Sequence, residues 1–137
     1  MYTSDGVVGL AGDSASLIFS TSCFSSPLAS PNREERLTLR GLADNAHARG
    51  SLEEAEALAR RALSLTSRPL YRANGRFCLG RVLISRGSLE LGCAELAASE
   101  SVFRARHTTG MLASAVAFQG LALALGGDVD GAWHRAR

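Results

Sequence analysis

Apolar and polar residues alternate along residues 32–137 with the period of an amphipathic helix. In the first stretch the apolar positions are Leu39, Leu42, Ala43 and Ala46. In the second they are Leu52, Ala55, Leu58, Ala59 and Ala62. Spacings of three and four residues place such side chains on one face of a helix. Ala and Leu supply most of the apolar residues and both favour helices. The pattern therefore predicts an all-α fold.

Turn residues divide this region into six predicted helices. Asn32 with Glu35, and Ser51 with Glu54, have the spacing of a capping box at a helix start. Gly50 suits the residue that follows a helix end. The predicted helices begin near Asn32, Ser51, Pro69, Ser88, Thr108 or Thr109, and Asp128, and the sixth runs to Arg137.

The turn sequence itself recurs, which indicates a repeat. The three copies are Arg49-Gly50-Ser51-Leu52-Glu53, Arg86-Gly87-Ser88-Leu89-Glu90 and Gly126-Gly127-Asp128-Val129-Asp130. The second copy follows the first by 37 residues, and the third follows the second by 40. Each turn separates two predicted helices, so the chain contains about two and a half helix hairpins.

These units resemble the tetratricopeptide repeat (TPR) family over roughly residues 35–137. The matching positions are Leu39, Leu42, Ala43, Ala46, Ala55, Ala59 and Ala62 in the first unit, Leu79, Gly80, Leu83, Gly92, Leu96 and Ser99 in the second, and Gly120, Leu123 and Ala132 in the third. The family's aromatic residue is replaced by Leu39, Arg76 and Val116, and its closing proline by Ser67. The resemblance implies an α-α superhelix, a TPR-like solenoid.

The length and composition of the units are similar to repeat regions of large bacterial regulators of the maltose-regulator (MalT-like) and LuxR types. In those proteins the repeats form a sensor or scaffold arm. The resemblance therefore implies a non-catalytic protein–protein interaction scaffold, part of a bacterial signalling or transcriptional regulator.

The resemblance also implies a binding surface, because the first helix of each unit lines the inner face of such an array. Carried over to this chain, that face contains Arg40, Asp44 and His47 from the first unit, Asn74, Phe77, Arg81 and Ile84 from the second, and Ser114, Ala117 and Leu121 from the third. The expected occupant is a protein or peptide. The alternative interpretation is ordinary helix surface.

Residues 1–31 differ from the rest and predict a flexible Ser/Thr-rich leader before a repeat domain at 32–137. They contain ten Ser or Thr residues and two of the three prolines. The chain has no stretch of 18 uninterrupted apolar residues, so we expect no membrane span. Three cysteines do not make a disulfide framework, which favours a reducing cytoplasm.

Catalytic or metal chemistry is not indicated by the Cys and His residues. Cys78 and Cys93 fit no zinc-ligand spacing, and both lie on apolar faces of predicted helices, as small core residues do. We therefore expect no enzyme activity, cofactor or metal. A fragment of a larger multidomain enzyme is an alternative that the sequence leaves open.

All basic residues are arginine, and two triplets suggest an anionic ligand as a further alternative. Arg33, Arg36 and Arg40 share one helix face, and Arg68, Arg72 and Arg76 share another. An Arg-mediated nucleic-acid-binding repeat would use them. The net charge is only +2 and the basic residues are not gathered in one stripe, so nucleic acid is not the expected direct ligand.

The fifth predicted helix is strongly apolar, with Met111, Leu112, Val116, Phe118, Leu121, Leu123 and Leu125. The short sixth helix cannot cover both of its sides. We therefore expect either further sequence beyond this end in the natural protein or self-association through the C-terminal helices.

Overall fold

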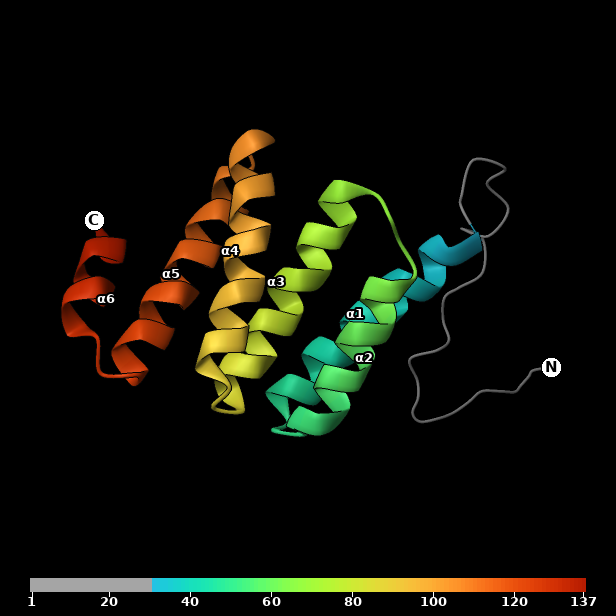
Figure 1. The fold of residues 1–137 in the computed structure, drawn as a ribbon. Helices are drawn as coiled ribbons and strands as arrows, with labels where there is room; N and C mark the ends of the chain where they lie inside the picture. Colours follow the sequence, from blue (N-terminus) through green and yellow to red (C-terminus); the bar gives the residue numbers. More distant parts are fainter. Residues whose placement is uncertain (1–30) are drawn as a thin grey trace. The chain divides into compact units, whose positions relative to one another are not determined.

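The computed structural model describes residues 31–137, which form six helices packed as an antiparallel array (Figure 1). The helices are α1 (Pro31–Ala48), α2 (Leu52–Ser64), α3 (Pro69–Ser85), α4 (Leu89–Ala105), α5 (Thr109–Leu125) and α6 (Val129–Ala136). Residues 35–137 make up one compact unit. The predicted all-α array of about two and a half hairpins is confirmed. Most of the predicted leader lies outside the described residues.

The recurring turns share one backbone geometry. Gly50, Gly87 and Gly127 have φ values of +81°, +90° and +93°, which glycine adopts without a steric penalty. The residue after each glycine donates its backbone N–H to a carbonyl five positions back, as Ser51 does to Ala46 at 2.8 Å. This arrangement satisfies carbonyl groups that a helix end leaves free. The glycine turns are therefore helix stops, as predicted.

Side-chain capping follows the prediction at α6 and departs from it at α1, α2 and α4. Asn32 lies inside α1, which is already helical at Pro31, so it does not start the helix. Ser51 and Ser88 precede α2 and α4 but make no side-chain cap hydrogen bond. Asp128 accepts a hydrogen bond from the backbone N–H of Gly131 at 2.8 Å. The backbone angles before α2 and α6 are similar, so the difference lies in the side chains and not in the backbone.

Helix α3 is the central element of the core. It contributes to one buried cluster with α1 and α2, made of Ala43, Ala59, Cys78, Leu79 and Leu83. It also contributes to a second cluster with α4 and α5, made of Ala73, Phe77, Ile84, Leu96, Phe103, Ala115 and Ala122. Because α3 packs against helices on both sides, it buries more than the single face expected of a surface helix.

Two glycines bring α3 and α4 close together. A Cβ added to Gly92 would lie 3.0 Å from the carbonyl oxygen of Gly80, and one added to Gly80 would lie 3.0 Å from the carbonyl oxygen of Gly92. Small residues at both positions therefore allow the backbones to approach. No helix in the described part of the chain is long and apolar enough to cross a membrane.

Candidate partner-binding surface

The structure brings three of the predicted surface residues together. Asp44 and His47 on α1 face Arg81 on α3. Arg81 Nη1 lies 3.5 Å from Asp44 Oδ1, and Arg81 Nη2 lies 3.4 Å from His47 Nδ1. The Arg81 side chain is 27% exposed and that of Asp44 47% exposed, so both remain open to a partner. We call these three residues the polar triad.

Arg81 also contacts two aromatic rings, which link the triad to α5. Its guanidinium carbon lies 5.7 Å from the ring centre of Phe77 and 5.5 Å from that of Phe118. The two rings meet edge to face, with centres 5.9 Å apart. A cation over aromatic rings is attracted to their negative faces. Arg81 is therefore held in place from two sides, by Asp44 and by the rings.

His47 is held as a neutral ring. Its Nε2 lies 2.7 Å from Ser85 Oγ. An arginine N–H can only donate, so Nδ1 of His47 accepts from Arg81 and Nε2 carries the proton toward Ser85. Burial and the charge of Arg81 lower the pKa of His47 below 6.5, against the opposing charge of Asp44. At neutral pH the triad therefore contains one cation and one anion.

Cys78 lies beneath the triad as a protonated thiol. Its Sγ donates to Asp44 Oδ1 at 3.6 Å. Burial and the Asp44 carboxylate raise the pKa of Cys78 to about 11. A nucleophilic cysteine needs the opposite shift. The expectation that Cys78 is a small buried core residue is confirmed.

The other predicted surface residues are distributed between core and surface. Phe77 and Ile84 are only 8% and 5% exposed and belong to the core cluster of α3, α4 and α5. Arg40 and Asn74 are half-buried, as is Ser114, which donates to the carbonyl oxygen of Gly110. Ala117 and Leu121 are exposed beside α6.

Sequence reasoning missed two features of this surface. Phe118 was assigned only to the apolar character of its helix, yet it contacts Arg81. Counting back 40 residues, as the last two glycine turns require, aligns Phe118 with Cys78, which the sequence predicted to be a core residue, so the repeat register did not place Phe118 on this face. In addition, Nε of Arg40 and Nε of Arg81 are buried without a hydrogen-bond partner among the described residues.

The two arginine triplets do not form free basic stripes. Arg36 is 7% exposed, and its guanidinium lies 4.2 Å from the ring centre of Tyr71. Arg72 donates to the carbonyl oxygen of Thr66 at 3.1 Å, and Arg76 pairs with Glu95 at 3.3 Å. Members of both triplets therefore make contacts within the chain.

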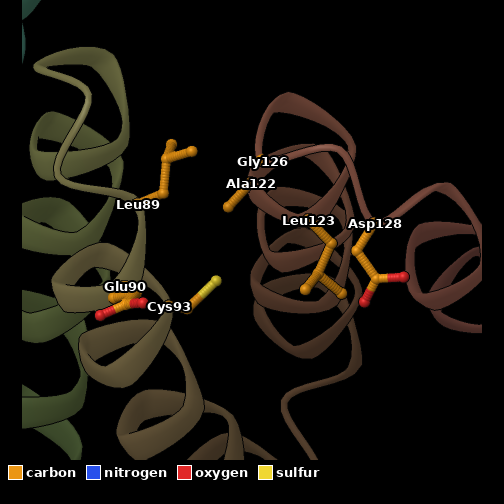
Figure 2. Close-up of a pocket in the computed structure, with 7 residues that line it drawn as sticks. All are labelled: Leu89, Glu90, Cys93, Ala122, Leu123, Gly126 and Asp128. Atoms are coloured by element: carbon orange, nitrogen blue, oxygen red, sulfur yellow. The ribbon is translucent and has the colours of Figure 1, made fainter.

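A pocket of about 320 Å³ lies between the start of α4 and the end of α5 (Figure 2). Its lining residues are Leu89, Glu90, Cys93, Ala122, Leu123, Gly126 and Asp128. Burial raises the pKa of Cys93, so its thiol is neutral. The two charged residues of the lining, Glu90 and Asp128, are both acidic.

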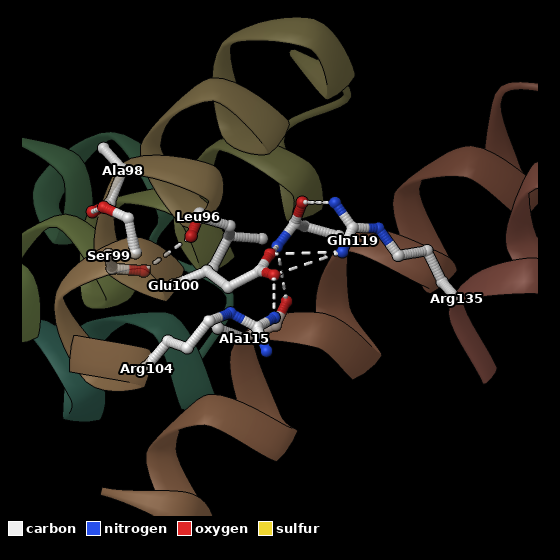
Figure 3. Close-up of polar contacts among 9 residues, drawn as sticks. Leu96, Ala98, Ser99, Glu100, Arg104, Ala115, Gln119 and Arg135 are labelled. Atoms are coloured by element: carbon white, nitrogen blue, oxygen red, sulfur yellow. Dashed lines mark hydrogen bonds and ion pairs between the residues drawn. The ribbon is translucent and has the colours of Figure 1, made fainter. Parts of the chain in front are cut away.

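A second polar cluster joins α4, α5 and α6 (Figure 3). Gln119 donates to Glu100 at 2.6 Å and accepts from Arg135 at 2.8 Å. Arg135 also pairs with Glu100 at 3.2 Å, and Arg104 donates to Glu100 at 2.7 Å. Burial would raise the pKa of Glu100, but these hydrogen bonds and the Arg135 charge together lower it. The cluster contains one carboxylate and two guanidinium groups, and its hydrogen bonds join α4, α5 and α6.

Comparisons of the chain with protein-family models, with curated proteins and with solved structures found no match. The interpretation of the surface therefore depends on its residues and their geometry.

Proposed function

We propose that the chain is a non-catalytic scaffold that binds a protein or peptide partner on the face formed by α1, α3 and α5. The observation that carries this proposal is the polar triad, in which Arg81 is partly exposed, oriented by Phe77 and Phe118, and paired with Asp44. Arginine anchored beside aromatic residues is typical of energetically important positions in protein interfaces.

The chemistry of the face supports binding over catalysis. The pKa of the Cys78 thiol is raised, and the pKa of His47 is lowered. The charges of Arg81 and Asp44 neutralise each other. Ser85 Oγ lies 2.7 Å from His47 Nε2, but the contact with Arg81 makes Nε2 a donor, so His47 does not accept the serine proton as covalent catalysis requires. The free thiols of Cys78 and Cys93 favour a reducing cytoplasm, and a role within a bacterial regulator remains part of this proposal.

The nucleic-acid alternative has less support. A phosphate-binding surface needs several unpaired basic side chains in one stripe. Here Arg36, Arg72 and Arg76 are engaged with Tyr71, Thr66 and Glu95. A protein or peptide that presents both donors and acceptors fits the paired charges of the triad better.

Partner capture with point variants tests this proposal. The immobilised chain would be incubated with an extract of the organism that encodes it, next to Arg81→Ala, Asp44→Ala and the control Arg60→Ala. Arg60 also makes an ion pair, but on α2 with Glu56. We expect one protein to be retained by the wild type and by Arg60→Ala and lost from both triad variants. Equal retention by all four proteins would refute the proposal, and circular dichroism would confirm that each variant is folded.

Self-association through the C-terminal helices is a second candidate function, which a separate observation favours. Large apolar side chains of α5 and α6 are exposed, namely Leu121, Leu125, Val129 and Trp133. Exposed apolar residues that gather in one region mark interaction sites.

Light scattering across a concentration series tests this second candidate. Leu125 and Leu91 are both 61% exposed, so Leu91→Ser is a matched control for Leu125→Ser. We expect the wild type and Leu91→Ser to dimerise and Leu125→Ser to stay monomeric over the same range. A wild type that is monomeric at every concentration would exclude self-association.

A further inference from the structure

The pocket between α4 and α5 has an apolar wall and an unpaired carboxylate at its rim. In Figure 2, Leu89 and Cys93 on α4 and Ala122 on α5 border the same space. Glu90 is exposed, and its side chain makes no hydrogen bond or ion pair with any described residue. Asp128 uses one oxygen to cap α6. The pocket therefore combines apolar surface with free negative charge.

The repeat shows what occupies the corresponding place one unit earlier. The last turn of α3 lies against the first turns of α2, as the last turn of α5 lies against those of α4. Counting from the glycine turns, Arg86 corresponds to Gly126 and Glu53 corresponds to Glu90. Arg86 reaches across this boundary to Glu53, at 3.8 Å, and also bonds Glu56.

At the later boundary the arginine is missing, and one of its two acidic partners is retained. Gly126 has no side chain to cross from α5 to α4, while Glu90 stands where Glu53 stands in the earlier unit. Cys93 replaces Glu56, so the neutral thiol adds apolar wall in place of a second carboxylate. The pocket thus lies at the boundary that Arg86 crosses one unit earlier, with an acidic residue in its lining.

We propose that this pocket binds an arginine side chain of a protein partner, with the aliphatic stem against Leu89 and Ala122 and the guanidinium at Glu90. The inference rests on the proposed scaffold function and adds the chemistry of one partner residue, away from the polar triad. Arginine and lysine both have a stem that can pack on apolar surface, but only the planar head of arginine donates two parallel hydrogen bonds to a carboxylate, which favours arginine.

A substitution within the chain tests whether the pocket fits such a side chain. Gly126 has a φ of −82°, and a Cβ added there would lie at ordinary contact distances, 3.4 Å or more from its neighbours. Gly126→Arg should therefore fill the pocket and raise the melting temperature above that of Gly126→Gln. The difference between these two variants should disappear in a Glu90→Gln background. An equal effect of Arg and Gln, or one that survives Glu90→Gln, would overturn the proposed contact with Glu90.

A ligand titration tests binding itself. The probe is N-acetylarginine amide, and the control is N-acetylcitrulline amide, which has the same shape without the charge. We expect arginine to shift the backbone amide signals of Glu90, Cys93 and Leu123 at millimolar concentration. It should bind about fivefold more tightly than citrulline, the effect expected of one exposed ion pair.

Two variants make this titration decisive. Glu90→Gln should remove the preference for arginine, and Gly126→Arg should block both probes. Equal binding of the probes to the wild type, or no shift at these residues, would overturn the inference. This result is independent of the triad experiment. If the pocket binds arginine and Arg81→Ala still captures the partner, the proposed arginine site is supported and partner binding on the α1, α3 and α5 face is refuted.

Discussion

The close approach of α3 and α4 leads to a prediction whose sign can be worked out from the structure. Replacing Gly92 with Ala adds one methyl group at the crossing. That carbon would lie 2.7 Å from Ile84 Cγ1, 3.0 Å from the Gly80 carbonyl oxygen and 3.2 Å from the Ile84 backbone nitrogen. Two of these three contacts are with backbone atoms, which can yield only if the helices move apart.

Two opposing effects set the magnitude. Ala is favoured over Gly inside a helix by about 1 kcal/mol. Forcing an extra methyl group into a packed core costs about 1–3 kcal/mol. The overpacking term is the larger, so Gly92→Ala should lower the free energy of unfolding by about 1 kcal/mol, taking the middle of that range.

Gly41→Ala provides a control with the same chemical change. Gly41 lies within α1, it is exposed, and a Cβ added there meets nothing within 4 Å. This variant should gain about 1 kcal/mol from helix propensity alone. The two variants should therefore differ by about 2 kcal/mol, or roughly 10 °C in melting temperature for a domain of this size.

Urea and thermal unfolding followed by circular dichroism would measure both variants beside the wild type. The expected order of stability is Gly41→Ala, wild type, Gly92→Ala. If Gly92→Ala were as stable as Gly41→Ala, the α3–α4 crossing would have room for a methyl group, and the close backbone approach would be refuted.

Three further predictions concern single side chains. Asp128→Ala should weaken α6 by about 1 kcal/mol, whereas Ser51→Ala should cost α2 less because Ser51 makes no cap hydrogen bond; amide hydrogen exchange would measure both. Because the pKa of Glu100 is lowered in the folded state, its contribution to stability is present above pH 4.5 and is lost as the pH falls through the folded pKa. In Glu100→Gln, the free energy of unfolding measured in urea should therefore depend less on pH in that acidic range. An unchanged pH dependence would contradict this. The ring of His47 should titrate below pH 6.5 in an NMR experiment and move upward in Arg81→Ala, and a value that does not move would exclude the contact between them.

Helix positions were predictable because the signals that set them are local. Gly50, Gly87 and Gly127 mark helix stops through a backbone conformation that other residues rarely adopt, and Pro69 marks a start. The turn between α4 and α5 was predicted from Thr108 or Thr109, and Thr108 does precede α5. What the sequence did not show is that His107, and not a glycine, adopts the positive φ there, at +57°.

The repeat register predicted which residues share the candidate surface, but it did not predict which of them are buried. The repeat register placed Asp44, His47 and Arg81 on one face, and the structure shows them in contact. The same register also put Ile84 on that face, yet its side chain is in the core. A helix wheel drawn for one unit shows one packing face, while α3 packs against neighbours on both sides, so its wheel alone cannot separate surface from core.

The pairs of neighbouring helices are held together by different forces along the array. Helices α3 and α4 meet at Gly80 and Gly92, where the absence of side chains lets the backbones approach closely. Helix α6 has no buried residue, and it is held by the Asp128 cap and by the Arg135 bonds to Glu100 and Gln119. Polar contacts of a short helix stabilise less than a packed core, so α6 should open before α3 and α4 do. A partner that covers the exposed apolar residues of α5 and α6 would therefore stabilise the helix that opens first. Binding of such a partner would be coupled to the ordering of α6.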